Sequence, residues 1–325
     1  MNDTVVVTDL YADLESDLTY IEDRLRDQLC SVQPILEDAA VHLLEAGGKR
    51  LRPVFVLLAG KFGAYRIDSL AQVAVGLELI HMATLVHDDV IDNADTRRGN
   101  STVKAHFGNR VAMYTGDFIF AQALSVLSEI KDPRAHRILS AAIEHMCIGE
   151  IEQIRDLYSL DQNLRIYLKR IRRKTALLIV MSCALGALVS QADSSIVASL
   201  RRFGYYAGMA FQITDDILDF TASAERLGKP VGGDLRQGNI TIPVLFALQN
   251  SQTKTDLGHL ISLNQTSEQV LEAIAIVKDS DGIVKAKALA DRYLDKANMA
   301  LSTLPDIPTR ESLIELASFV GQRDH

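Results

Sequence analysis

Apolar positions recur at helical spacing along most of this chain. In the first such segment they fall at every third or fourth residue, at Leu14, Leu18, Ile21, Leu25 and Leu29. Because charged residues fill the positions between them, the segment predicts an amphipathic helix with one face against a core. The same pattern predicts helices over residues 71–92, 110–130, 135–158, 165–190, 195–220 and 282–302. Breaks are expected at Pro53, Pro133, Pro230, Pro243, Pro305 and Pro308.

Two segments depart from the amphipathic pattern. From Leu70 to Ile91 nearly every helical face is apolar, which is typical of a helix at the centre of a core. From Thr221 to Gly238 the chain is polar and rich in glycine, so we expect a loop there, and a mobile lid is one use for it. Because the long segments look helical and do not alternate as strands do, the predicted fold class is all-α, a single large helical bundle.

Composition limits the class of protein. A chain of 325 residues with 48% hydrophobic content can bury a large core, and no Pro/Gly/Ser-rich linker divides it. One domain over residues 1–325 is therefore predicted. The formal net charge of −8 disfavours a general nucleic-acid binder, which needs a positive surface.

The cysteines and the N-terminus indicate a cytoplasmic protein. Cys30, Cys147 and Cys183 are too scattered for a disulfide framework or a metal site. The first residues are acidic, unlike the basic start of a signal peptide. The longest weakly polar stretch, Thr175 to Ser190, is shorter than the roughly 20 residues that a bilayer requires, so no transmembrane segment is predicted.

Two acidic strings carry the strongest chemical signal. Asp88 with Asp92, and Asp215 with Asp219, repeat a spacing of four residues after apolar runs. On a helix this spacing puts both carboxylates on one face with Cβ atoms about 5–6 Å apart, within reach of one hard cation. Mg²⁺ usually takes one or two carboxylates and completes its shell with water and phosphate oxygens, so a phosphorylated ligand is expected. Either string alone would equally suit a solvated helix end, but the repetition favours metal binding.

Basic residues offer groups for phosphate binding. The run 47–53 places three cations beside two glycines, where they could clasp a diphosphate, although a helix C-cap with a solvated basic turn would look the same. Arg97 and Arg98 could bind phosphate oxygens through their guanidinium forks, or form a surface pair. In the basic run 169–174 most side chains are expected in solvent, and Lys174 is the candidate ligand.

Together these residues resemble the trans-isoprenyl diphosphate synthase family. The likeness runs from about Gly47 to Pro243 and weakens toward the C-terminus. Its motifs stand in the family's order: Gly48-Lys49-Arg50-Leu51-Arg52-Pro53, Leu85-Val86-His87-Asp88-Asp89-Val90-Ile91-Asp92, Arg97-Arg98-Gly99, Gly116-Asp117, Lys174-Thr175 and Phe211-Gln212-Ile213-Thr214-Asp215-Asp216. The resemblance implies an all-α bundle around a deep central cavity, with the acidic motifs facing across its mouth.

The resemblance also implies a role for each matching residue. Three Mg²⁺ ions would bridge the acidic motifs to an allylic diphosphate, with Asp88, Asp92 and Asp215 as principal ligands. The full metal set is Asp88, Asp92, Asp215, Asp216 and Asp219, and the catalytic set is Asp88, Asp89, Asp92, Lys174, Gln212 and Asp215. Isopentenyl diphosphate would bind Lys49, Arg52, His81 and Arg98, and the allylic substrate Arg97, Lys174, Thr175, Gln212 and Lys229. His81 would also suit a hydrogen-bonded core histidine.

The implied reaction is prenyl chain elongation. Metals and cations bound to the diphosphate would let the allylic C–O bond ionise in a site shielded from water, and the double bond of isopentenyl diphosphate would attack the cation. The released diphosphate would take the proton, so no side-chain base is needed. Ala83 and Thr84 are small where short-chain relatives carry aromatic stops, which implies an open tunnel and a medium or long product.

Residues 149–154 and 170–176 look like the catalytic component of heptaprenyl or hexaprenyl diphosphate synthases. That subgroup implies a dimer, expected to be a heteromer with a small non-catalytic subunit. It also implies a heptaprenyl product, made from farnesyl diphosphate, for menaquinone side chains. A hexaprenyl or octaprenyl product is the alternative. The chain would be cytoplasmic, and peripheral to the membrane during product release.

Two other functions would use some of the same residues. A terpene cyclase also ionises allylic diphosphates with an aspartate cluster, but the basic run 47–53 would then lack an isopentenyl partner. A non-catalytic regulatory subunit of a synthase is disfavoured because both the acidic motifs and the basic residues are complete. Product analysis separates these functions from chain elongation.

Overall fold

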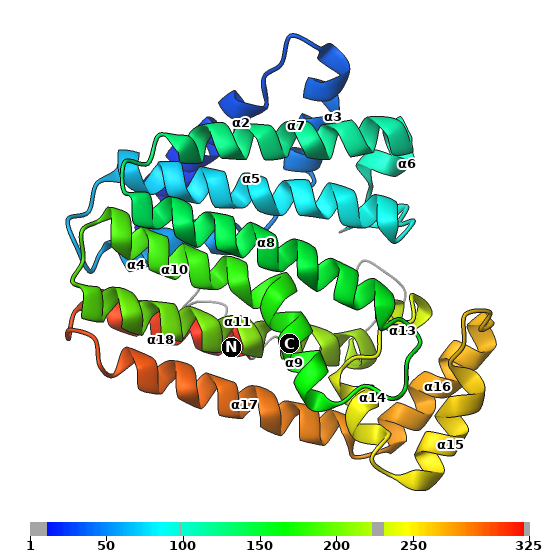
Figure 1. Ribbon diagram of the computed structural model, residues 1–325. Coiled ribbons are helices and arrows are strands. Elements are labelled where there is room, and N and C mark those ends of the chain that lie inside the picture. The colour runs from blue at the N-terminus through cyan, green and yellow to red at the C-terminus, as the bar shows by residue number, and fades with distance from the viewer. Residues whose placement is uncertain (1–11, 98, 223–230, 322–325) are drawn as a thin grey trace. The chain divides into compact units, whose positions relative to one another are not determined.

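The computed structural model describes residues 12–97, 99–222 and 231–321, and these are almost entirely helical (Figure 1). Within them the strands are β1 (Thr96–Arg97) and β2 (Asn100–Ser101), which pair antiparallel with Thr96 opposite Ser101. The prediction of an all-α fold is therefore confirmed.

The chain forms two compact units. The first unit comprises Met1–Ala141, Leu178–Gly204 and Ala300–Leu316, and the second comprises Ala142–Leu177, Tyr205–Met299 and Ala317–His325. The prediction of a single domain over residues 1–325 stays a prediction.

Each predicted segment is helical, and further helices lie outside these segments, one of them within the 221–238 stretch that was expected to be a loop. The first unit holds α2 (Glu15–Leu29), α3 (Pro34–Glu45), α4 (Leu51–Gly60), α5 (Ile67–Ile91), α6 (Val103–Phe107) and α7 (Asn109–Ser128). The second holds α9 (Leu164–Ile171), the π-helical turn η1 (Arg172–Ala176), α13 (Gly233–Arg236), α14 (Ile242–Ala247), α15 (Ser251–Leu260) and α16 (Ser267–Asp279). Residues of both units occur in α8 (Pro133–Arg155), α10 (Leu177–Val189), α11 (Ser194–Thr221), α17 (Gly282–Leu301) and α18 (Pro308–Gly321).

Helix α5 is the core helix of the first unit, as its uniform apolar sequence predicted. Leu70, Leu77 and Val86 are fully buried, and α5 packs along α7, beside which it runs in Figure 1. The opening helix α2 buries Ile21 and Leu25 from its predicted stripe and also contacts α5. The acidic string that ends α5 is thus attached to the most extensively packed helix of this unit.

Two details differ from the sequence prediction. Pro53 does not break a helix: it is the third residue of α4, where its missing N–H removes no hydrogen bond because the first turn has no partner for it. The segment 165–190 is not one regular helix, because the π-helical turn η1 separates α9 from α10. Turns of this kind occur frequently at functional sites.

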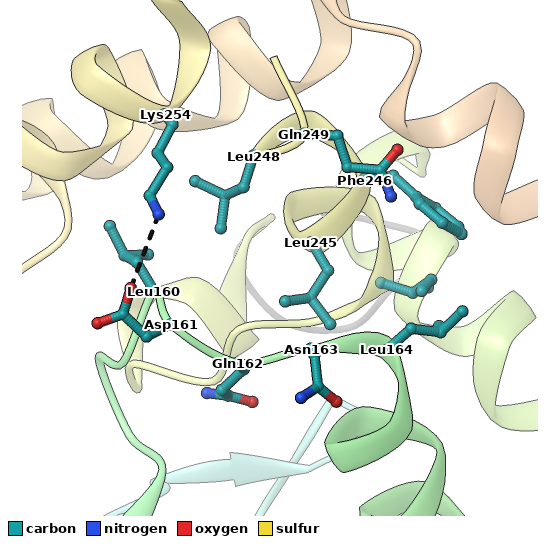
Figure 2. A pocket seen from close by; sticks show the side chains of 11 residues that line it. Leu160, Asp161, Gln162, Asn163, Leu164, Leu245, Phe246, Leu248, Gln249 and Lys254 are labelled. Carbon is teal, nitrogen blue, oxygen red and sulfur yellow. Dashed lines mark ion pairs between the residues drawn. The ribbon is translucent and has the colours of Figure 1, made fainter. Parts of the chain in front are cut away.

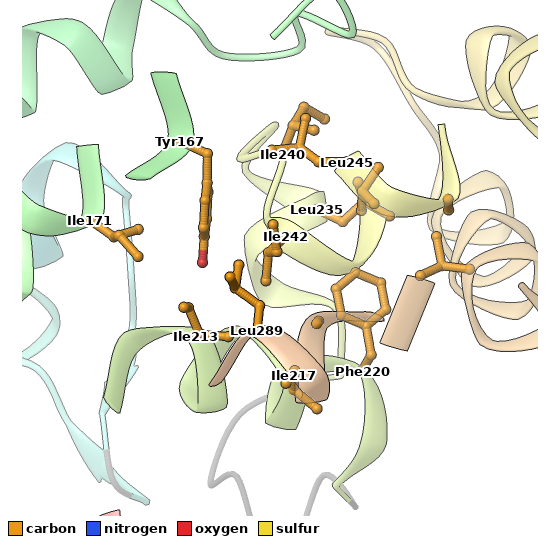
Figure 3. Close-up of a cluster of buried hydrophobic side chains, with 14 of the residues drawn as sticks. Tyr167, Ile171, Ile213, Ile217, Phe220, Leu235, Ile240, Ile242, Leu245 and Leu289 are labelled. Atoms are coloured by element: carbon orange, nitrogen blue, oxygen red, sulfur yellow. The ribbon is translucent and has the colours of Figure 1, made fainter. Parts of the chain in front are cut away.

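The core of the second unit gathers around α11. Tyr167 of α9 lies among aliphatic side chains that include Ile213, Ile217 and Leu235 (Figure 3). Its relative exposure is 0%. A buried hydroxyl needs a hydrogen-bond partner, so the burial of Tyr167 implies that a polar group lies inside this core.

By length and composition, α5 and α7 are apolar enough to cross a bilayer, and both are longer than the 175–190 stretch considered above. In α5, 72% of the most apolar stretch is buried inside the protein, as is usual for a helix in a protein core. In α7 the corresponding share is 39%, and Tyr114 and Leu124 are exposed.

Candidate active site

The first acidic motif occupies the C-terminal end of α5. The N–H of Asp92 donates to the carbonyl of Asp88 at 2.8 Å, so the helical repeat continues through the motif. Asp88 and Asp92 are both half-buried. Residues four apart on a helix share one face, so the two aspartates lie one turn apart on the same side of α5, and their sharing of a cation stays a prediction.

Asp89 has a different role from its neighbours. The residue is only 1% exposed, and its carboxylate receives a forked hydrogen bond from Arg97 of β1, with N···O distances of 2.7, 3.0 and 3.2 Å. Burial raises the pKa of Asp89, and the Arg97 guanidinium opposes that rise. Asp89 therefore anchors the β1–β2 hairpin to α5. Contact of Arg97 with the allylic diphosphate stays a prediction, and Arg98 lies outside the described residues.

The side chain of His87 contacts the Gly116-Asp117 dipeptide of α7. Its Nε2 lies 3.3 Å from a carboxylate oxygen of Asp117 and 3.4 Å from the carbonyl oxygen of Met113. A Cβ atom at position 116 would lie 2.3 Å from that nitrogen, so only glycine leaves room for the ring. His87, which had no assigned role, thus joins α5 to α7 at the level of the acidic motif.

The basic loop between α3 and α4 turns through left-handed backbone, with φ of 76° at Gly47 and 46° at Arg50. The N–H of Gly47 donates to the carbonyl of Leu44 at 3.1 Å, so this glycine also caps α3. Lys49 is exposed and Arg52 is half-buried. Their contact with isopentenyl diphosphate, and that of half-buried His81, stay predictions.

The expectation that three cations of this loop project toward a ligand is wrong for Arg50. Its guanidinium donates to Glu22 at 2.8 and 2.9 Å and lies 3.4 Å from Glu78, which is 3% exposed. Burial alone would lower the pKa of Arg50, but these hydrogen bonds and charges raise it. Arg50 therefore ties α2, α4 and α5 together.

The second acidic motif, on α11, places its three aspartates in unlike surroundings. Asp215 is exposed, whereas Asp216 and Asp219 are 2% and 1% exposed. The carboxylate of Asp219 accepts the backbone N–H groups of Gly233 at 3.2 Å and Asp234 at 3.1 Å. Asp219 thereby fixes the start of α13, and its predicted contact with a metal stays untested.

Asp216 lies in a buried network of side chains. One carboxylate oxygen accepts the Tyr167 hydroxyl and the other accepts the Gln212 amide, both at 2.7 Å. The Gln212 carbonyl accepts the Thr175 hydroxyl at 2.5 Å. Burial first, and then the charge of Asp234, raise the pKa of Asp216 to about 8. Gln212 and Thr175, predicted to act together, are therefore direct neighbours.

Tyr167 was not among the predicted site residues. A tyrosine on the apolar face of a helix is more often a core residue, and nothing in the spacing of α9 relates it to α11. Its hydrogen bond joins residues 49 positions apart in the sequence. Only the packing of these two helices brings the hydroxyl to Asp216.

The turn η1 carries Lys174 and Thr175. Lys174 donates to Glu150 of α8 at 2.9 Å, and the neighbouring Arg173 donates to Glu152 at 2.5 Å. The expectation that most of the basic run 169–174 is solvated needs correction, because these pairs and the buried Arg170 tie the run to the rest of the second unit.

We expect the pH dependence of unfolding to report the Asp216 carboxyl. Its pKa of about 8 in the folded protein, against an ordinary 3.8, means that the folded state holds a proton that the unfolded chain releases. The resulting stabilisation is complete below the lower value and is lost as pH rises through about 8. Denaturant unfolding of the metal-free protein across this range should show the decline. Asp216→Asn, which cannot ionise, should flatten the curve, and an unchanged slope would contradict the assignment.

The acidic residues fit magnesium in type and number. Within residues 12–97, 99–222 and 231–321, no three or more His, Cys, Asp or Glu side chains converge on one metal position. Asp88 and Asp92 supply a pair of carboxylates, which is the number that Mg²⁺ usually takes when phosphate and water complete its shell. Lys229, predicted beside the allylic substrate, lies outside the described residues.

A separate pocket of about 330 Å³ lies in the second unit, between the segment before α9 and helices α14 and α15 (Figure 2). Leu245 and Leu248 are among its lining residues, and Lys254 lies 3.7 Å from Asp161, which also lines it. None of the predicted site residues lines this pocket.

Comparisons with known proteins agree with the motifs. The family model described as polyprenyl synthetase matches residues 33–277. The chain is 54% identical over 313 residues to heptaprenyl diphosphate synthase component 2 of Bacillus subtilis, covering 96% of this chain and 90% of that protein.

Solved structures give the same result. Heptaprenyl diphosphate synthase from Staphylococcus aureus superposes with a TM-score of 0.93 at 42% identity, covering 96% of this chain and 99% of that one. A polyprenyl synthase from Caulobacter crescentus, complexed with calcium and isoprenyl diphosphate, gives a TM-score of 0.92 at 33% identity over 97% of both chains.

Proposed function

The chain belongs to the polyprenyl synthetase family, whose members are prenyltransferases, and we propose that it is the catalytic component of a heteromeric heptaprenyl diphosphate synthase. It joins isopentenyl diphosphate to an allylic diphosphate such as farnesyl diphosphate. The observation that carries this proposal is the identity of 54% with a heptaprenyl diphosphate synthase component over 96% of the chain.

Residues of the two acidic motifs and of η1 are proposed to carry the reaction. Asp88 and Asp92 on α5, and Asp215 on α11, are proposed to hold Mg²⁺, three ions in all when the substrate is bound. Bound Mg²⁺ would withdraw negative charge from the diphosphate as it leaves. Thr175 and Gln212 present hydroxyl and carbonyl oxygens, which stabilise an allylic cation without attacking it. Lys174, held by Glu150, supplies a cation for the diphosphate.

The proposed site has no need of a nucleophile. The acceptor is a carbon–carbon double bond, and the diphosphate released can take the proton. Water would react with an allylic cation, so an apolar surround is required. An apolar wall also stabilises the growing hydrocarbon, by roughly 0.8 kcal/mol for each CH₂ group that it buries.

Product length is proposed to depend on Ala83 and Thr84 of α5. Ala83 is 1% exposed, and the Thr84 hydroxyl donates to the carbonyl of His81 at 2.8 Å. We expect Ala83→Phe to shorten the main product, because an aromatic ring there would stop the growing chain. Mass spectrometry of the products checks this, with Ala83→Ser as the control of similar size. An unchanged length distribution in a folded Ala83→Phe variant would contradict it.

A small non-catalytic subunit is proposed as the partner. The related Bacillus protein is named as component 2, which describes a synthase of more than one component. On α8, Ile148, Ile151 and Ile154 are 37%, 67% and 50% exposed and follow each other at intervals of three residues. An exposed apolar ridge of this kind is typical of a protein contact. We propose that the long product serves menaquinone synthesis and is released at the membrane by a cytoplasmic enzyme.

One assay tests the proposal. The purified chain is incubated with farnesyl diphosphate, isopentenyl diphosphate and Mg²⁺, with and without a candidate small subunit, and the products are identified by mass spectrometry. Heptaprenyl diphosphate formed only with both components is the expected result. Full activity of the chain alone would contradict the heteromer, a hexaprenyl or octaprenyl product would correct the length, and a cyclic hydrocarbon would indicate a terpene cyclase.

A further inference from the structure

We propose that Tyr167 is a positioning residue for prenyl transfer, because its buried hydroxyl holds Asp216 in the orientation that fixes the amide of Gln212. The proposal rests on the transferase activity and on the role proposed for Gln212, but it does not depend on product length or on the partner. All the residues involved belong to the second unit.

The hydrogen bonds fix which way the Gln212 amide faces. The Tyr167 hydroxyl donates to Oδ2 of Asp216 at 2.7 Å, which leaves Oδ1 to accept the amide nitrogen of Gln212 at 2.7 Å. Because the amide nitrogen faces Asp216, the carbonyl oxygen of Gln212 must face the other way, toward the Thr175 hydroxyl at 2.5 Å. The Gln212 carbonyl is thereby presented beside η1, the turn that also carries Lys174.

Burial makes the Tyr167 hydroxyl necessary. Asp216 is 2% exposed and Tyr167 is fully buried, so water does not readily replace a lost partner. A buried carboxyl oxygen without a partner is costly, and it would turn toward another donor. The Gln212 amide also donates to Asp216, so a movement of the carboxyl is passed to the amide.

Arg170 packs over the ring of Tyr167. Its guanidinium lies 5.7 Å from the centre of the Tyr167 ring and donates to the carbonyl of Ile240 at 2.6 Å and to Gln162 at 2.9 Å. Arg170 is 5% exposed. A side chain fixed by ring contact on one side and a hydrogen bond at its tip has little freedom, as a residue that orients a functional group requires.

The consequence is a specific kinetic effect. Tyr167→Phe keeps the ring and its packing but removes the hydrogen bond. We expect kcat to fall about 10- to 100-fold because the Gln212 carbonyl is misplaced relative to the developing cation. The KM for isopentenyl diphosphate should stay unchanged, since its predicted ligands Lys49 and Arg52 belong to the first unit.

A double-mutant cycle separates positioning from simple stabilisation. Total incorporation of labelled isopentenyl diphosphate is measured in the assembly that is active in the preceding assay, for wild type, Tyr167→Phe, Gln212→Leu and the double variant. If Tyr167 acts through Gln212, the double variant is no slower than Gln212→Leu alone. Independent, multiplying effects would overturn the proposal.

Two further measurements keep the test decisive. Tyr158→Phe alters a half-buried tyrosine of the same unit, whose ring lies against Gly238, and it should leave kcat unchanged. A crystal structure of Tyr167→Phe should show the Gln212 amide turned away from its wild-type position or in two orientations. An unmoved amide with normal kcat would refute the role of Tyr167, whether or not the product is heptaprenyl diphosphate.

Discussion

Replacing Asp88 with alanine should lower the rate of prenyl transfer by about 1000-fold or more, because one of the two carboxylates of the α5 pair is lost, and metal stabilisation of a leaving group is worth several kcal/mol. The fold should persist. Asp88 is half-buried near the end of α5, where removing a negative charge does not disturb the apolar contacts of the helix. Steady-state kinetics across a range of Mg²⁺ concentrations measures the loss.

The matched control is Asp68→Ala, at the first turn of the same helix. Asp68 is exposed and accepts the Tyr20 hydroxyl at 2.9 Å, far along the chain from the acidic motif. Its loss should cost stability of about 1 kcal/mol or less and leave activity intact. Wild-type turnover by Asp88→Ala would remove the metal assignment, and equal losses in both variants would point to a general weakening of α5.

Replacing Gly208 with alanine should damage both stability and activity. Helix α11 approaches η1 so closely at this point that a Cβ atom would lie 2.7 Å from Cα and 2.9 Å from Cβ of Ala176. Ala176 belongs to a backbone that cannot yield as a long side chain can. Overpacking of this kind costs about 1–3 kcal/mol. The displaced turn would also carry Thr175 away from Gln212, so kcat should fall as well.

Gly258→Ala provides the comparison within the same unit. Gly258 lies in α15, and the nearest atom to an added Cβ is a methyl carbon of Leu160 at 4.0 Å, so alanine fits. Since alanine favours the helix by up to about 1 kcal/mol over glycine, this variant should be at least as stable as wild type. Thermal unfolding measures both effects. A Gly208→Ala protein as stable and active as Gly258→Ala would show that the close approach of α11 to η1 is not required for stability or activity.

The pairing of the charged residues could not be predicted from the sequence. Arg50 stands in the same basic run as Lys49 and Arg52, yet it pairs with Glu22 and the buried Glu78 inside the first unit. Residue type alone does not distinguish these three cations. The three side chains differ in how far they are buried, and burial depends on which helices pack against each other.

The second acidic motif makes the same point. Asp215 and Asp219 have the helical spacing that favours a shared cation, but Asp219 accepts two backbone N–H groups at the start of α13. Asp216 accepts Tyr167 and Gln212. A carboxylate string can bind metal, cap a helix or orient an amide, and the choice depends on donors that come from distant parts of the chain.

Most of the long helices, the central place of α5, the spacing of Asp88 and Asp92 by one helical turn, and the family to which the motifs belong could be predicted from the sequence. These follow from periodicity and short-range spacing, which the helix repeat converts directly into geometry. Only the tertiary packing shows that Arg50 pairs with Glu22 and Glu78, that Asp219 accepts N–H groups at the start of α13, that η1 interrupts a helix, and that Tyr167 meets Asp216. Those outcomes depend on contacts between residues far apart in the chain, where desolvation and hydrogen bonding, rather than spacing, select each partner.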